Sequence, residues 1–316
     1  MKHTAKVTLI LMGIFLLSQI FGLYALNLDL KIIKNAQIGV IESINYSQPI
    51  IGARPEMGST SAFWYVITAI FIGTVILLVL IRFKQVKIWK AWFFLAVLMT
   101  ISTTLGIFIP MIIAFVLAFI LAVLKIFKPN FFIQNITEIL MYTGIAYLLV
   151  PLFKSDYGVL MAVLLLLVVA VYDAYAVWQS KHMIKMANFQ TESKIFAGLS
   201  VPYSQKDKGK TEIKLAIPKG ADFKAENKGE KIALLGGGDI AFPLIFSGVV
   251  MQALVLNYGV SKIFAFLEVQ IITVFAAGAL LLLFIYGKKD RFYPAMPFIG
   301  AGCLLGYSLV MLLQFL

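Results

Sequence analysis

The chain has 316 residues, of which 61% are hydrophobic and 13% are charged, whereas a soluble domain is about half apolar and a quarter charged. This composition excludes a soluble globular protein and a disordered chain. The single cysteine, Cys303, excludes a disulfide framework, and the two histidines lie outside the apolar segments, so we predict no metal site.

Nine apolar segments approach the length of about 20 residues that crosses a bilayer. They are residues 7–26, 62–82, 89–107, 109–126, 134–153, 157–179, 232–254, 263–286 and 294–315. The first could instead be a signal peptide, because Lys2 and Lys6 precede it, but it is long for one and no clear cleavage site follows. The sequence thus predicts an all-α integral membrane protein with nine transmembrane helices.

Two polar segments interrupt the apolar ones. Residues 27–61 are predicted to form an outer loop, and residues 180–231, rich in lysine, glycine and acids, a long inner loop. Within the second, residues 211–217 alternate polar and apolar side chains, which predicts a strand. The chain is therefore divided into an N-terminal six-helix part (1–179), the loop (180–231) and a C-terminal three-helix part (232–316).

The positive charges gather on one side of the predicted topology. With the N-terminus inside, the inner segments hold 22 of the 27 lysines and arginines; leaving out the long loop, the split is 11 to 5. Because such residues favour cytoplasmic segments, we expect the N-terminus and the long loop in the cytoplasm and the C-terminus outside the cell. The net charge of +12 then reflects topology, and we predict no nucleic-acid partner.

Four acidic residues lie within or near the apolar segments: Glu138, Asp173, Asp239 and Glu268. The free energy of inserting a helix into the membrane rises by at least about 2.5–3.5 kcal/mol when a carboxylate lies at the bilayer centre. Glu138 and Glu268 lie about one turn from a membrane face, so their carboxylates are expected to reach the interface. Asp173 and Asp239 lie deeper, about two turns from the inner face, on consecutive antiparallel helices. We expect them to face each other.

Two backbone features fall near the depth of these aspartates. Gly236, Gly237 and Gly238 precede Asp239, and each glycine disfavours a helix interior by about 1 kcal/mol. We expect the backbone at these glycines to be extended or to be approached closely by another group. A simpler alternative is that the glycines only allow two helices to pack closely. The ninth segment opens with Pro294-Ala295-Met296-Pro297, whose prolines delay helix formation, although proline is also favoured at an ordinary helix start.

These residues resemble the motifs of the presenilin and signal peptide peptidase superfamily of intramembrane aspartyl proteases. Val171-Tyr172-Asp173 looks like its YD motif, Leu235-Gly236-Gly237-Gly238-Asp239 its GxGD motif, and Pro294-Ala295-Met296 its PAL motif with Met in place of Leu. The motifs occur in the family's order, on the sixth, seventh and ninth segments. Prepilin peptidases also carry GxGD, but they have fewer spans and lack the late proline motif.

The resemblance implies nine helices with a long loop between the sixth and seventh, and Asp173 and Asp239 as the catalytic pair. The predicted orientation is similar to that of presenilins and the reverse of that of signal peptide peptidases. The chain is most similar to a prokaryotic, archaeal-type presenilin homologue. The expected partners are transmembrane protein or peptide substrates and the lipid bilayer.

Two nearby carboxyls suffice for peptide hydrolysis, because one stays protonated while the ionised one activates water. No cofactor is required. The stretch Ile232–Leu235 is predicted to offer strand-forming backbone to an unwound substrate, with Leu235 next to the glycines. Pro294–Pro297 is expected to border the same cleft. Tyr172 either orients a carboxyl or is an ordinary helix-interface aromatic.

Two other functions compete with proteolysis. A proton- or cation-coupled transporter would also place buried aspartates beside broken helices, but it is expected to show internal repeats and a polar pathway, and the sequence shows neither clearly. A membrane scaffold without catalytic activity would leave both buried acids unexplained. We therefore predict an intramembrane aspartyl endopeptidase, with the transporter as the alternative.

Overall fold

The computed structural model of the protein describes residues 5–35, 41–50, 52–155, 157–179, 196–204, 230–287 and 293–315. The helices in these ranges are α1 (Ala5–Asp29), α2 (Ser59–Arg82), α3 (Val86–Leu105), α4 (Met111–Phe127), α5 (Phe131–Leu149), the 3-10 helix η1 (Val150–Phe153), α6 (Gly158–Trp178), α8 (Gly238–Tyr258), α9 (Lys262–Tyr286) and α10 (Met296–Leu313). The strands are β1 (Lys31–Lys34), β2 (Ile41–Asn45), β3 (Gly198–Ser204) and β4 (Glu230–Gly236).

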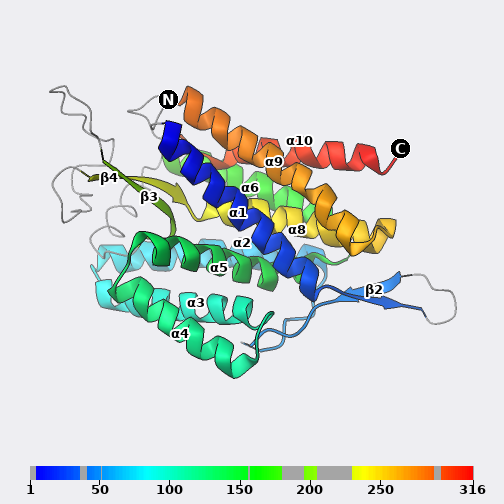
Figure 1. Ribbon diagram of the computed structural model, residues 1–316, viewed down its shortest axis with the longest axis horizontal. Coiled ribbons are helices and arrows are strands. Elements are labelled where there is room, and N and C mark those ends of the chain that lie inside the picture. Colours follow the sequence, from blue (N-terminus) through cyan, green and yellow to red (C-terminus); the bar gives the residue numbers. More distant parts are fainter. Residues whose placement is uncertain are drawn as a thin grey trace.

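The predicted helical membrane fold is confirmed. Eight of the described helices are long and apolar enough to cross a membrane, and α4, with 17 residues, is apolar but shorter. Each corresponds to one predicted segment. The helices run along the long axis of the molecule, as Figure 1 shows.

Two small sheets lie at opposite ends of this bundle (Figure 1). The antiparallel hairpin β1–β2 lies at the end where the chain finishes, and β3–β4 lies at the end where the chain begins. The hairpin was not predicted, because residues 27–61 were interpreted as a loop. The predicted strand 211–217 lies outside the described residues.

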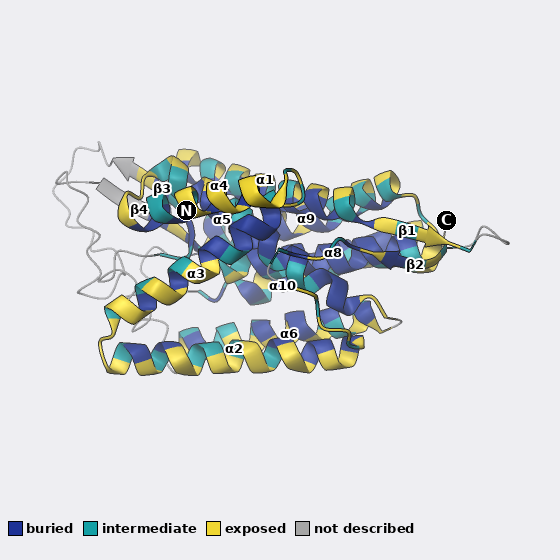
Figure 2. Cartoon of the chain, turned by 90° about the horizontal axis from the view of Figure 1, so that it is seen from below, coloured by how far each residue is buried: buried dark blue, intermediate teal, exposed yellow. Residues whose placement is uncertain are grey.

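Helix α8 forms the centre of the bundle, with 83% of its most apolar stretch buried, whereas only 17% of the corresponding stretch of α2 is buried. Figure 2 shows this contrast between the dark, enclosed α8 and the largely exposed α2. Helices α1, α5, α6, α9 and α10 all pack against α8. Helix α8 is therefore enclosed along most of its length, whereas at its start Gly238 is exposed and Asp239 is partly buried.

The predicted start of the seventh span is wrong. The span was expected from residue 232, but α8 begins at Gly238, and residues 230–236 instead form β4. β4 pairs antiparallel with β3, from Gly198 opposite Gly236 to Ser204 opposite Glu230. The glycines disfavour helix, and β3 supplies the backbone partners that a membrane protein must provide. The prediction of strand-forming backbone over Ile232–Leu235 is confirmed, but extended backbone reaches only Gly236, because Gly237 has helical φ and ψ angles and Gly238 begins α8.

Helices α9 and α10 approach closely because α10 presents glycines to α9. A Cβ atom on Gly302 would lie 2.6 Å from the Phe275 carbonyl oxygen, and one on Gly306 would lie 2.7 Å from Ile272 Cα. Small residues allow such backbone contact between membrane helices. This contact fixes α10, whose first residues are part of the candidate site.

We predict that Gly306→Ala lowers the thermal unfolding temperature of the purified protein, because the added methyl meets the α9 backbone. Overpacking of this kind costs about 1–3 kcal/mol. The matched control is Gly278→Ala on α9, where an added Cβ has no described atom within 4 Å. Equal unfolding temperatures for the two variants would contradict the close α9–α10 contact.

Candidate active site

Asp173 lies on α6 near its C-terminal end and is partly buried. Its Oδ2 accepts a hydrogen bond of 3.1 Å from the backbone N–H of Met296, the first residue of α10. The first N–H groups of a helix have no partner within the helix and carry its positive dipole end. An aspartate from one helix thus caps another, which joins the Tyr-Asp motif to the proline motif.

Asp239 lies in the first turn of α8, not about two turns into a helix as predicted. Its carboxylate lies beside the preceding glycines, since a Cβ on Gly236 would be 3.3 Å from Asp239 Oδ2. Pro243, four residues later, has no N–H to give to the Asp239 carbonyl. The backbone around Asp239 is therefore less regular than that of a continuous helix.

The three motif-bearing segments pack together. Helices α6, α8 and α10 contact one another pairwise, so the two aspartates lie on neighbouring helices. The start of the third helix is bound to one of these aspartates. The predicted meeting of the three segments agrees with this packing, while the expectation that Asp173 and Asp239 face each other stays a prediction.

Among the glycines of the motif, Gly237 has the closest contact with another helix. A Cβ atom on it would lie 2.2 Å from the hydroxyl oxygen of Tyr142 on α5, whereas one on Gly238 would meet only the Phe242 ring, at 3.6 Å. Tyr142 is buried and was missed by sequence reasoning, because a tyrosine in an apolar segment carries no signal of what it contacts. Gly237 thus fits the interpretation as a position of close backbone approach.

The remaining predicted site residues, in β4, α6 and the proline motif, differ in how far they are buried and in what they contact. Leu235 is buried at 3% exposure, while its neighbour Leu234 is 39% exposed. The Tyr172 hydroxyl lies 3.4 Å from the Thr74 hydroxyl of α2, a contact that favours its role as an interface aromatic. In the proline motif, Pro294 and Met296 are buried, while Ala295 and Pro297 are partly exposed.

The prediction that Glu138 reaches the membrane interface is wrong. Its side chain is fully buried and forms an ion pair with Lys125, which lies in the last turn of α4. From the sequence, Lys125 was counted among the 22 lysines and arginines of the inner segments, so its pairing with Glu138 was not foreseen. Glu268 is partly exposed and accepts a 2.7 Å hydrogen bond from the Gln314 side chain.

Comparison with known proteins places the chain in a family. The family model described as signal-peptide peptidase, presenilin aspartyl protease matches residues 13–315. A solved structure of a presenilin family intramembrane aspartate protease aligns with a TM-score of 0.56 and 18% identity, over 96% of this chain and 99% of that chain. This likeness concerns the fold. A search of curated proteins found no match.

We predict that Gly237→Ala lowers the unfolding temperature, because its methyl would meet the buried Tyr142 hydroxyl. Gly238→Ala is the matched control, since its added Cβ makes only an ordinary contact at 3.6 Å. Thermal unfolding of both purified variants measures the difference. If Gly238→Ala were the more destabilised, the described packing of the glycine segment against α5 would be incorrect.

Proposed function

The chain belongs to the signal peptide peptidase and presenilin family of aspartyl proteases, and from this premise we propose that Asp173 and Asp239 are its catalytic pair. The protein is a multi-pass membrane protein and an intramembrane aspartyl endopeptidase. One observation carries the assignment of the pair: the N–H of Met296 at the start of α10 binds Asp173 on α6. Helix α6 packs against α8, which carries Asp239 in its first turn.

The proposed chemistry needs only the two carboxyls and one water. Like charges close together cannot both ionise, so one carboxyl keeps its proton. The ionised carboxylate takes a proton from water while the water oxygen bonds to the substrate carbonyl carbon, and the neutral carboxyl donates a hydrogen bond to the developing oxyanion. The C–N bond then breaks, and the leaving amine receives a proton. The roles of the two residues belong to the coupled pair.

A transmembrane substrate must unwind before its peptide bond can be attacked, and β4 offers a strand for the unwound segment to pair with. The N–H and C=O groups of Ser200 on β3 both bond to the Asn135 side chain of α5, not to β4. Opposed residues of an antiparallel pair alternate between bonded and non-bonded. The partner of Ser200, Leu234, therefore directs its own N–H and C=O away from β3.

The same alternation directs the backbone groups of Leu235 toward β3. Leu235 then contributes buried packing, while Leu234 lies on an edge of β4 that pairs with no other strand among the described residues, five residues before Asp239 along the chain. We propose that the substrate strand pairs with this edge of β4. We propose that Pro294-Ala295-Met296 borders the substrate site from α10, since the N–H of Met296 binds Asp173.

We predict that Asp173→Asn and Asp239→Asn each reduce cleavage of a transmembrane peptide by more than about 100-fold, the scale of lost acid–base catalysis. The unfolding temperature should change little, because asparagine keeps the side-chain shape. The assay compares purified variants with the wild type, using mass spectrometry of the products.

The matched control is Glu268→Gln, which neutralises an acid that is bound to Gln314 and that we assign no catalytic role. It should cleave like the wild type. Substantial turnover by either aspartate variant would contradict the assignment of the pair, and so would equal loss of activity in the control.

We also propose an orientation. The end with the N-terminus and β3–β4 lies opposite the end with the C-terminus and β1–β2 (Figure 1), and most lysines and arginines fall in segments assigned to the first end. Positive residues favour the cytoplasmic side. The N-terminus and the loop 180–231 would then be cytoplasmic, and the C-terminus would be outside the cell.

An epitope tag inserted near Lys208 is therefore expected to be inaccessible to an impermeant reagent on intact cells. A tag inserted between β1 and β2 is the control and should be labelled. Labelling of the first tag but not the second would show the reverse orientation.

A further inference from the structure

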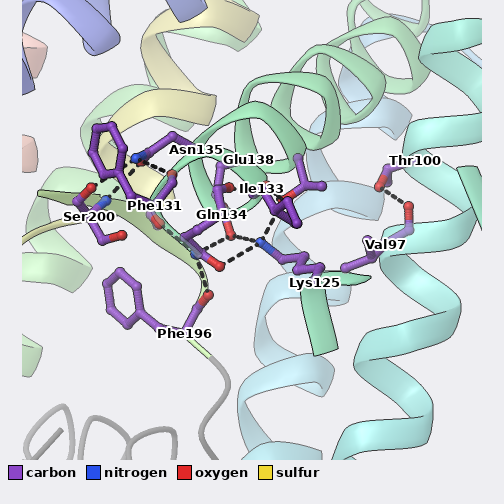
Figure 3. A network of polar contacts seen from close by, with 12 residues as sticks. Val97, Thr100, Lys125, Phe131, Ile133, Gln134, Asn135, Glu138, Phe196 and Ser200 are labelled. Carbon is purple, nitrogen blue, oxygen red and sulfur yellow. Dashed lines mark hydrogen bonds and ion pairs between the residues drawn. The ribbon is translucent and has the colours of Figure 1, made fainter. Parts of the chain in front are cut away.

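The mechanism makes no use of a buried polar cluster between α4, α5 and β3, drawn in Figure 3. Its centre is the ion pair of Lys125 and Glu138, whose side chains are 2% and 0% exposed. Lys125 also donates to the Gln134 side-chain oxygen and to the Thr137 hydroxyl, both at 3.2 Å. Apolar residues would stabilise such a site at least as well, so the cluster calls for another explanation.

Lys125 fixes which way the Gln134 amide points. The ammonium group can only donate, so the Gln134 oxygen must face it and the NH2 group must face away. That NH2 group donates to Glu138 and to the backbone carbonyls of Phe196 and Gly198, each at 3.0 Å. The ion pair thus orients an amide that binds the beginning of β3.

Asn135, the next residue of α5, binds the same strand. Its amide donates to the Ser200 carbonyl at 2.9 Å, and its oxygen accepts from the Ser200 N–H at 3.0 Å. Two consecutive amides therefore occupy the outer edge of β3, as a further strand would do (Figure 3). The two amides thus occupy the edge of the sheet formed by β3. The opposite edge, formed by β4, is where we propose that the substrate pairs.

The same helix also contacts the glycine motif. Gln134, Glu138 and Tyr142 are spaced four residues apart and share one face of α5, and the Tyr142 hydroxyl packs against Gly237. One face of one helix therefore holds both the strand that pairs with β4 and the turn that leads to Asp239.

We propose that Lys125, Glu138, Gln134 and Asn135 are positioning residues that set the register of β3–β4 relative to the aspartates, and so select which substrate bond is cut. The proposal rests on the proposed pairing of substrate with β4. A strand advances about 3.3 Å per residue. If the sheet shifted by one or two residues relative to the aspartates, a neighbouring peptide bond of the substrate paired with β4 would therefore lie beside them.

The test is the position of cleavage, which a merely stabilising role would not move. Gln134→Leu and Asn135→Leu are compared with the wild type on one transmembrane peptide, and the products are identified by mass spectrometry. The ratio of product cut at the main wild-type bond to product cut at neighbouring bonds should fall about fivefold or more, the factor expected from one lost hydrogen bond.

The ion pair is tested by replacing both partners, Lys125→Met with Glu138→Leu, because removing one alone would leave a buried charge. This double variant keeps an apolar, filled site but no longer orients Gln134, and it should spread the cleavage positions in the same way. If a leucine variant does not fold, Asn135→Asp takes its place, since it keeps the side-chain shape and removes the amide donor to the Ser200 and Phe131 carbonyls.

The matched control is Gln252→Leu, a buried amide of α8 that donates to the Val150 carbonyl of η1. It should leave the cleavage positions unchanged even where it lowers stability. Folded network variants that cut at the wild-type bond with the wild-type ratio would overturn the proposal. Failure of the wild type to cleave in an Asp239-dependent way would instead overturn the proposed function.

Discussion

A carboxylate inside a membrane protein persists only where other groups bind it, and this constraint organises the site around Asp173. Its partner is the N–H of Met296, which is available because the first N–H groups of a helix lack partners within it. The start of α10 must therefore stay beside α6. The contact of Gly302 and Gly306 with α9 holds α10 in place, so helix packing far from the aspartates supports them.

A second constraint comes from α5, which takes no part in the proposed chemistry. Its polar face binds the backbone of β3 through Asn135 and Gln134 and touches the glycine turn through Tyr142. Because α5 contacts both β3 and the glycine turn, it fixes the position of the sheet relative to Asp239. Such sharing suits an enzyme whose substrate must unwind and be positioned on the sheet before it is cut.

Hydropathy and isolated charges in the sequence predicted the helices. They also singled out Asp173 and Asp239 as acids in apolar segments, where a carboxylate is unfavourable unless it has a function or a partner. The sequence could not predict where β4 ends and α8 begins, since a short apolar run suits a strand as well as a helix; only pairing with β3 decides. The partner of Glu138 was missed because Lys125, 13 residues away, becomes a neighbour only once α4 packs on α5. Pairings of this kind depend on tertiary structure.

The proposed mechanism requires one water, or one hydroxyl, to touch both Asp173 and Asp239. An experimental structure with a bound hydroxyl-bearing transition-state isostere tests it most directly, because such a compound mimics the tetrahedral diol. We expect the isostere hydroxyl to bond to both Asp173 and Asp239, with the nearest carboxyl oxygens no more than about 5.5 Å apart, the reach of two hydrogen bonds. Carboxyls on opposite faces of the bundle, with protein packed between them, would contradict it.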